Sequence, residues 1–214
     1  MICSLNEIEA LARKAARGAG MSWGLAEEAG KAVRWLSDHG FPGPDLLAEL
    51  LRRNDGKPYS DLAPRQLDGV WRARRGPLCP IVAGALICDR ADELGQGATL
   101  RLGEIAVPLL LAPFAYEAAR TAGMTVALEW QGVSLVLGGA APRLAGDETA
   151  LVVADAGSVA LFPADDRATA SVRTSAGRQV SAETMRALEG FATRTYAPAT
   201  EASRAGAGAG REGD

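Results

Sequence analysis

The 214-residue chain contains one histidine, His39, and three cysteines, and both scarcities exclude kinds of site. Zinc and most transition-metal centres need several histidine or cysteine ligands. One histidine without any CxxC pair does not supply them. Three cysteines cannot all pair, so we expect Cys3, Cys79 and Cys88 to be reduced, mostly buried thiols. The sequence predicts no multi-histidine metal site and no disulfide framework.

Phosphate-binding signatures and excess positive charge are also missing. The glycine pairs at 18–20 and 95–97 lack the third glycine of a dinucleotide fingerprint, and no glycine-lysine-serine or glycine-lysine-threonine occurs. The 23 basic and 26 acidic residues give a net charge of −3, whereas nucleic acids and anionic membranes attract a concentrated positive field. We expect no cofactor and no nucleic-acid partner. Oxygen-only binding of a hard cation by Asp155, Asp165 or Asp166 stays open, although loop aspartates more often shape turns.

Long apolar runs are absent as well. The longest, from Ile105 to Ala115, is interrupted by Pro108 and Pro113 and is much shorter than the roughly 20 residues of a membrane-spanning helix. The first residues have neither the basic region nor the apolar core of a secretory signal. We therefore expect a cytoplasmic protein without a membrane partner. Hydrophobic residues make up 48% and charged residues 23%, a balance typical of globular domains.

Helical patterns fill the first third of the chain. Ser4-Leu5-Asn6-Glu7 has the form of a capping box, and the helix that it begins should end at Gly18 to Gly20. A second helix is predicted from Ser22 to Gly40. Both carry alanine-rich apolar stripes, which predicts a closely packed helical hairpin. Two more helices are predicted, over 45–53 and 64–75.

Short strands are predicted after residue 78. Gln131-Gly132 is a two-residue hairpin turn between apolar runs, and Asp155-Ala156-Gly157 suggests a second hairpin. A helix should begin at Ser181. The other expected elements are strands over 79–88, 99–102, 104–111, 124–130, 133–137, 149–154, 158–162 and 168–174 and a helix over 114–121. Consecutive hairpins imply mainly antiparallel pairing.

Helices followed by a run of strands favour an α+β fold over an alternating α/β fold. We expect a helical N-terminal part over 1–78 and an antiparallel β-rich part over 79–197 that ends in a helix. These two parts should form one compact unit. The small, polar segment 198–214 is low in complexity and is expected to be disordered.

The second predicted helix carries the strongest candidate chemistry. Trp23, Glu27, Lys31 and Arg34 recur at i, i+4, i+8 and i+11 and so share one face, with Glu28 beside them. Glu27 and Glu28 are the candidate catalytic acid–base residues, since partial burial or a second carboxylate raises a carboxyl pKa toward the useful range. Trp23 would form a wall of the pocket.

Cations near these carboxylates predict an anionic ligand. Lys14 and Arg17 on the first helix, with Lys31 and Arg34 on the second, would hold a substrate carboxylate. The alternative is that Glu27–Lys31 and Glu28–Lys31 are surface helix pairs of minor stability value. A second candidate nucleophile is Cys79, for which His39 is the available base. Its alternative is a buried structural cysteine.

The N-terminal block reads Cys3-Ser4-Leu5-Asn6-Glu7, Lys14-Ala15-Ala16-Arg17-Gly18-Ala19-Gly20, Ser22-Trp23-Gly24-Leu25-Ala26-Glu27-Glu28-Ala29-Gly30-Lys31-Ala32 and Arg34-Trp35-Leu36. This block resembles a bacterial family of proteins of about two hundred residues known as a domain of unknown function. The resemblance implies a soluble bacterial protein of small-molecule catabolism. It brings no established activity.

Two functions follow from these patterns. In the first, the protein is a cofactor-free hydrolase, lyase or isomerase that acts on an anionic catabolic metabolite through Glu27 or Glu28. In the second, it is a noncatalytic accessory subunit of a partner enzyme or a self-assembling module. Its alanine-rich helices and the tryptophans Trp23 and Trp71 would then anchor an interface.

Overall fold

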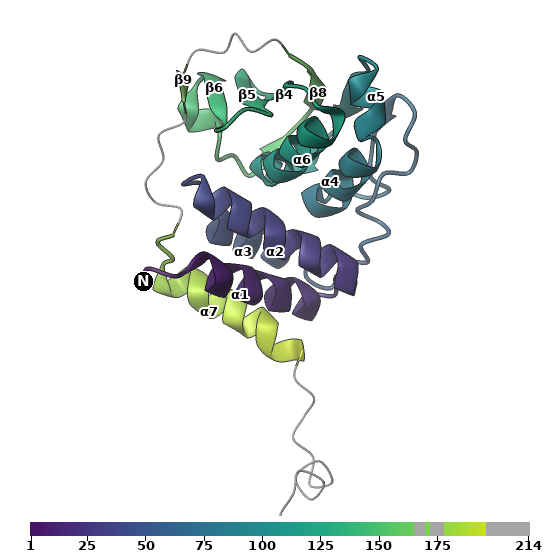
Figure 1. The fold of residues 1–214 in the computed structure, drawn as a ribbon. Helices are drawn as coiled ribbons and strands as arrows, with labels where there is room; N and C mark the ends of the chain where they lie inside the picture. The colour runs from purple at the N-terminus through teal and green to yellow at the C-terminus, as the bar shows by residue number, and fades with distance from the viewer. Residues whose placement is uncertain (165–169, 172–177, 196–214) are drawn as a thin grey trace, which may run out of the picture.

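The structure is a computed structural model that describes residues 1–164, 170–171 and 178–195. Figure 1 shows two layers, a lower bundle of helices and an upper sheet backed by further helices. The lower layer holds α1 (Leu5–Gly18), α2 (Trp23–Asp38), α3 (Gly43–Asn54) and α7 (Ala182–Ala192), and the upper one holds α4 (Pro80–Asp89), α5 (Ala91–Gly95) and α6 (Ala112–Ala122). The tail predicted to be disordered, 198–214, lies outside the described residues.

Side-chain caps begin three helices of the lower layer, α1, α2 and α7. Ser4 and Glu7 form the predicted capping box, in which each side chain accepts a hydrogen bond from the other residue's backbone N–H. The Ser22 hydroxyl accepts from the Leu25 N–H at the start of α2, and the Ser181 hydroxyl accepts from the Thr184 N–H at the start of α7. The predicted α1–α2 hairpin is confirmed, and buried alanines line both helices where they meet, namely Ala12, Ala15, Ala16, Ala26 and Ala29. A capping side chain satisfies backbone N–H groups that the helix itself leaves unpaired.

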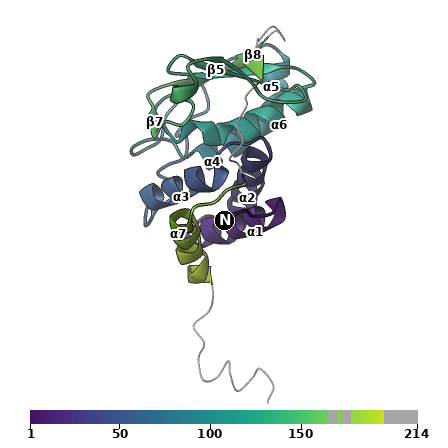
Figure 2. The same cartoon turned by 90° about the vertical axis from the view of Figure 1, so that its left-hand side faces the viewer.

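The last helix returns to the first. The amino group of Met1 donates to the Val180 carbonyl and the Val180 N–H donates to the Met1 carbonyl, each at 2.8 Å. Figure 2 shows α7 beside α1 at the bottom of the molecule. The two backbones approach so closely that a Cβ on Gly18 would lie 1.8 Å from the carbonyl oxygen of Phe191. The helical layer therefore contains both ends of the described chain.

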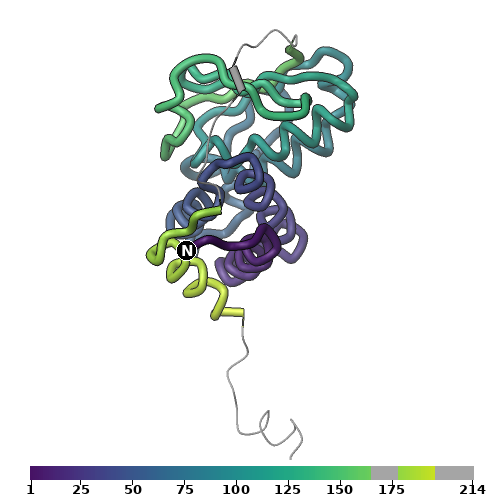
Figure 3. The backbone as a smooth tube through the Cα atoms, turned by 60° about the vertical axis from the view of Figure 1, so that its left-hand side comes forward, coloured from purple at the N-terminus to yellow at the C-terminus, as the bar shows by residue number. Residues whose placement is uncertain are grey.

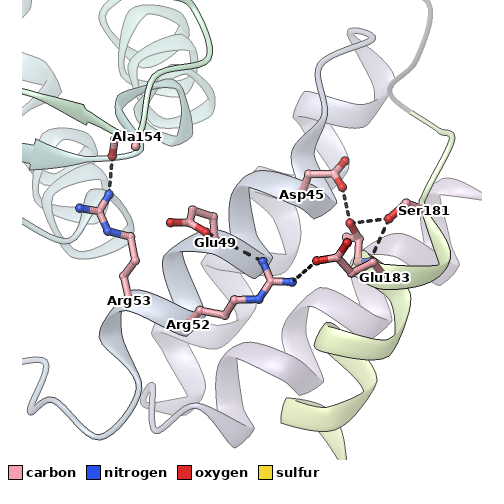
Figure 4. Close-up of polar contacts among 8 residues, drawn as sticks. Asp45, Glu49, Arg52, Arg53, Ala154, Ser181 and Glu183 are labelled. Carbon is pink, nitrogen blue, oxygen red and sulfur yellow. Dashed lines mark hydrogen bonds and ion pairs between the residues drawn. The ribbon is translucent and has the colours of Figure 1, made fainter.

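Helix α3 makes polar contacts with α7 in the same layer and with the upper layer (Figure 4). Thr184 donates to the Asp45 carboxylate, and Arg52 lies 3.6 Å from the Glu183 carboxylate. At the other end of α3, Arg53 donates to the carbonyl of Ala154 and, at 2.6 Å, to the carboxylate of Asp155. Because these contacts span segments far apart in sequence, α3 fixes how the two layers meet.

The upper layer is built on a seven-stranded sheet with the order β1-β2-β8-β4-β5-β6-β9. Its strands are β1 (Val70–Trp71), β2 (Leu100–Leu102), β4 (Val126–Trp130), β5 (Val133–Leu137), β6 (Arg143–Gly146), β8 (Val159–Pro163) and β9 (Ala170–Ser171). Only β1 and β2 pair in parallel; all other neighbours are antiparallel. A second small sheet pairs β3 (Ile105–Ala106) with β7 (Asp155–Ala156). The fold is α+β, as predicted.

Helix α6 packs against β4 and β5 and covers the inner face of the sheet, as the tube in Figure 3 lets the reader follow. The predicted hairpin around Gln131-Gly132 is confirmed, since Trp130 pairs with Val133. Both turn residues have positive φ, 46° and 81°, as a two-residue turn of type I′ requires. Short 3₁₀ turns occupy Pro108–Leu111, Glu148–Ala150 and Thr193–Thr195. Within the described ranges no helix is long and apolar enough to cross a membrane.

Four predicted elements are wrong. The segment 79–88, predicted as a strand, forms α4 from Pro80 onward. The prediction fails because this short segment is apolar on all sides and has no polar face that marks a helix. Residues 64–75, predicted as a helix, contain turns and β1, which pairs with distant β2. The segment 104–111 is a strand only at Ile105–Ala106. The second hairpin does not form: the strand predicted over 149–154 is absent, with a 3₁₀ turn at Glu148–Ala150, and β8 pairs with β2 and β4. Most of the strand predicted over 168–174 lies outside the described residues.

Candidate functional site

A pocket of about 660 Å³ lies where α2, α4 and α6 meet. Helix α2 contributes two of the residues that the sequence singled out, Glu28 and Lys31. The pocket combines charged side chains with an aromatic and apolar wall, formed by Glu28, Lys31, Ala32, Trp35, Ala85, Cys88, Asp89, Pro113, Phe114, Tyr116 and Glu117. Enclosed apolar surface with a few polar groups is the usual character of a small-molecule site.

Carboxylates dominate the charge of this pocket. Glu28, Asp89 and Glu117 line the pocket together with one ammonium, that of Lys31. The Lys31 Nζ donates to Glu28 at 2.7 Å, and this hydrogen bond raises the pKa of Lys31. Lys31 is therefore protonated at neutral pH. The hydrogen bond from Arg120 lowers the pKa of Glu117, which is therefore ionised there. The lining side chains carry a formal charge of −2, of which Arg120, paired with Glu117 outside the lining, offsets one. The remaining negative charge favours a cation.

Aromatic rings form the opposite wall. Trp35 stacks on His39 with ring centroids 4.1 Å apart and lies 5.3 Å from the ring of Tyr116. The His39 Nδ1 lies 2.8 Å from the Trp35 carbonyl oxygen; because a carbonyl only accepts, Nδ1 carries a proton. The indole N–H of Trp35 is buried without an acceptor among the described residues. Faces of tryptophan and tyrosine attract organic cations, which agrees with the charge of the pocket.

The pocket thiol is a poor nucleophile. Cys88 is partly buried, and burial, with further contributions from Glu28 and Glu117, raises its pKa to about 12. Cys79, the nucleophile suggested by the sequence, lies at the N-terminus of α4 and is 1% exposed. Burial raises the pKa of Cys79 to about 11. Since the thiolate is the reactive form, both cysteines are unreactive at neutral pH.

The structure separates the two candidate catalytic residues. Glu28 lines the pocket, whereas Glu27 points away from it and lies 3.9 Å from Arg13 of α1. Successive residues of a helix are about 100° apart around its axis, so Glu27 and Glu28 do not share a site. The Glu28–Lys31 surface pair considered from the sequence is present, but it stands at the rim of a pocket.

Of the predicted anion-binding residues, Lys31 lies beside Glu28, whereas Lys14, Arg17 and Arg34 do not line the pocket. Arg34 donates to Asn6 and to Glu9 of α1, at 2.5 and 3.0 Å. Arg17 donates to the Met21 carbonyl at 2.7 Å, and its guanidinium lies 5.0 Å from the centre of the Trp23 ring. Lys14 is exposed on α1. Trp23, predicted as a pocket wall, is 66% exposed.

Asp89, Tyr116 and Glu117 belong to the pocket but were not singled out from the sequence. Asp89 is the last residue of α4, Tyr116 and Glu117 lie in the middle of α6, and no motif links them. Their common location depends on the crossing of α2, α4 and α6, which periodicity does not predict. Among the described residues no group of three or more His, Cys, Asp or Glu side chains is arranged to hold a metal ion.

Comparison with known proteins agrees with the resemblance of the N-terminal block. Residues 3–77 match the family described as "Protein of unknown function (DUF3726)", which covers α1 to α3 and β1. A search of curated proteins finds no match. Among solved structures, malate dehydrogenase from Entamoeba histolytica is similar over 68% of this chain, with 8% identity and a TM-score of 0.47. The match covers 48% of that enzyme, so the chain spans about half of its length.

Proposed function

We propose that this protein is a cofactor-free enzyme that binds a small organic cation in the α2–α4–α6 pocket and uses Glu28 for proton transfer. The observation that supports it is the lining of the pocket, in which three carboxylates accompany one lysine beside the rings of Trp35 and Tyr116. The anionic substrate expected from the sequence depended on Lys14, Arg17 and Arg34, which lie elsewhere. The proposed substrate is therefore an amine rather than a carboxylate.

The chemistry follows from the Glu28–Lys31 pair. The carboxylate of Glu28 accepts a proton from the bound substrate, and the Lys31 ammonium 2.7 Å away stabilises negative charge as it shifts. Asp89, which forms no ion pair among the described residues, attracts the cationic part of the substrate, and the faces of Trp35 and Tyr116 lie beside it. Hydrolysis, elimination and isomerisation all need such a group. We place this activity in cytoplasmic small-molecule catabolism, in keeping with three free cysteines.

A thermal-shift screen tests the class of ligand. Small alkyl and aryl amines should raise the melting temperature of the protein, because a ligand that binds only the native state stabilises it. Their matched carboxylic acids should not. A rise with the acids and none with the amines would contradict the proposal.

Glu28→Gln tests the catalytic role, with Glu27→Gln as the matched control. With an amine substrate found in the screen, Glu28→Gln should lower kcat by about 100-fold or more, the usual effect of losing a general acid or base. Glu27→Gln should leave kcat nearly unchanged, since Glu27 lies outside the pocket. Both variants should keep the wild-type melting temperature within a few degrees, because neither side chain is buried and each forms only a surface ion pair. Equal turnover in the two variants would remove Glu28 from the mechanism.

The exposed ring of Trp23 favours a second candidate, a self-assembling module or an accessory subunit of a partner enzyme. Tryptophan is the residue type most enriched among interface anchors, and Arg17 holds this ring in place on its inner side. If the chain forms a homo-oligomer through Trp23, Trp23→Ala should raise the dissociation constant by about 30-fold or more, measured by light scattering against concentration. Val152→Ala, at another exposed apolar residue, is the control. A monomer at all concentrations would exclude the self-assembling form of this candidate.

A further inference from the structure

A second hollow, of about 530 Å³, lies on the outer face of the sheet. Directly paired residues of neighbouring strands point to the same face of a sheet. Here the pairs are Arg101 of β2 with Ala160 of β8, Ala160 with Glu129 of β4, and Glu129 with Ser134 of β5. Their neighbours along each strand point inward, where Leu128 is fully buried beneath α6. The hollow is therefore on the face of the sheet opposite α6, away from the pocket that α6 helps to form.

The floor of the hollow is small and its two sides carry opposite charges. Ala160 lies between Arg101 and Glu129, whose backbones are two strand spacings apart, or about 10 Å. Arg72 joins Arg101 on the positive side: its side chain passes over Gly103, where an added Cβ would lie 3.2 Å from the Arg72 Cγ. The lining thus has two guanidinium groups on one side and one carboxylate on the other. Between them lies only the methyl side chain of Ala160.

These three charges have no partner among the described residues, whereas four arginines of the chain form close ion pairs. Arg53, Arg90, Arg120 and Arg194 each form an ion pair with a carboxylate at 2.5–2.6 Å. Arg72, Arg101 and Glu129 form neither an ion pair nor a side-chain hydrogen bond in that part of the chain. The hollow therefore has a net charge of +1. Its two positive charges and its one negative charge lie on opposite sides of Ala160.

We propose that this hollow binds a small amino dicarboxylate, with its carboxylates on Arg72 and Arg101 and its ammonium on Glu129. Such a ligand carries two negative charges and one positive charge. Each of these charges has a site group of opposite sign, and the net charge of the ligand, −1, matches the +1 of the hollow. Guanidinium groups bind carboxylates through paired hydrogen bonds, and the short Ala160 side chain leaves room for the carbon chain. The site is separate from the amine pocket and does not depend on the proposed enzymatic activity.

Calorimetric titration of the full chain with L-glutamate and with glutarate tests the site, since the two probes differ only by the ammonium group. Wild-type protein should bind L-glutamate with a dissociation constant near 1 mM and glutarate about tenfold more weakly, as expected for one charge-assisted hydrogen bond. Glu129→Gln should abolish this preference. Arg101→Gln should weaken both probes by about tenfold or more.

Two further variants separate a binding effect from a folding effect. Ala160→Val adds two methyl groups to the floor without changing charge and favours a strand, so it should block both probes while the protein stays folded. Arg74→Gln, at an exposed arginine that does not line the hollow, should bind like the wild type. No saturable binding of L-glutamate by the wild type, or wild-type binding by Arg101→Gln or Ala160→Val, would overturn the proposal.

Discussion

Replacing Gly18 with alanine is expected to lower the free energy of unfolding by about 3 kcal/mol, at the upper end of overpacking effects. The new Cβ would lie 1.8 Å from the carbonyl oxygen of Phe191 and 2.8 Å from its carbonyl carbon. Both are backbone atoms of α7, so no side-chain rotation relieves the contact. The helices must move apart, and the contacts between α1 and α7 are lost with that movement. Urea unfolding followed by circular dichroism measures the change.

Gly24→Ala is the matched control for Gly18→Ala. Gly24 lies in the first turn of α2, and a Cβ there meets nothing within 4 Å. Alanine removes the excess backbone entropy of glycine in the unfolded chain, so this variant should gain about 0.5–1 kcal/mol. The two substitutions are chemically identical and should act in opposite directions. A loss in both variants, or in neither, would contradict the close approach of α1 and α7.

Replacing Trp71 with alanine is expected to cost about 3–5 kcal/mol, the range for large aromatic residues in a core. Trp71 is fully buried, its indole N–H donates to the Leu67 carbonyl at 2.9 Å, and the Arg90 guanidinium lies 5.8 Å from the centre of its ring. Truncation leaves a cavity, whereas the Leu67 carbonyl keeps the hydrogen bond that it accepts from Arg90 at 2.6 Å. The same urea titration measures the loss. If Trp71→Ala does not fold, Trp71→Phe keeps most of the volume and should show a smaller loss from the missing hydrogen bond.

Trp23→Ala is the control for Trp71→Ala. Because the Trp23 ring is 66% exposed, its removal costs only the contact with Arg17, about 0.5–1 kcal/mol. A similar loss in the two tryptophan variants would contradict the burial of Trp71. The sequence grouped both residues as interface anchors, and for Trp71 this interpretation is wrong. Its burial results from pairing of β1 with distant β2, which no local pattern predicts.

Local signals predicted the helical layer well. The capping residues Ser4, Ser22 and Ser181 identify three helix starts, because the cap and its partner lie within one turn of each other. The Gln131-Gly132 turn identified β4 and β5 for the same reason. Pairings between distant segments were not predictable in this way. Strand β8 follows a turn signal that suggests a hairpin, yet its partners are β2 and β4.

The candidate site was predictable only in part. The sequence places Glu28 and Lys31 on α2, but it does not say which side of that helix meets a pocket. That side is set by α4, which the sequence analysis assigned to a strand, and by α6, which carries Glu117. The hollow on the sheet was missed because Arg101 and Glu129 come together through the pairing of β8 with both β2 and β4.

The return of α7 to α1 bears on how the protein is made. A ribosome adds about 5–20 residues per second, so α1 emerges roughly 10–30 seconds before α7. During that time the flank of α1 around Gly18, which α7 later covers, has no partner from its own chain. Contacts between such distant segments also slow folding, since a long loop must close first. Nascent chains of this protein should therefore depend on chaperones until translation has passed the last helix.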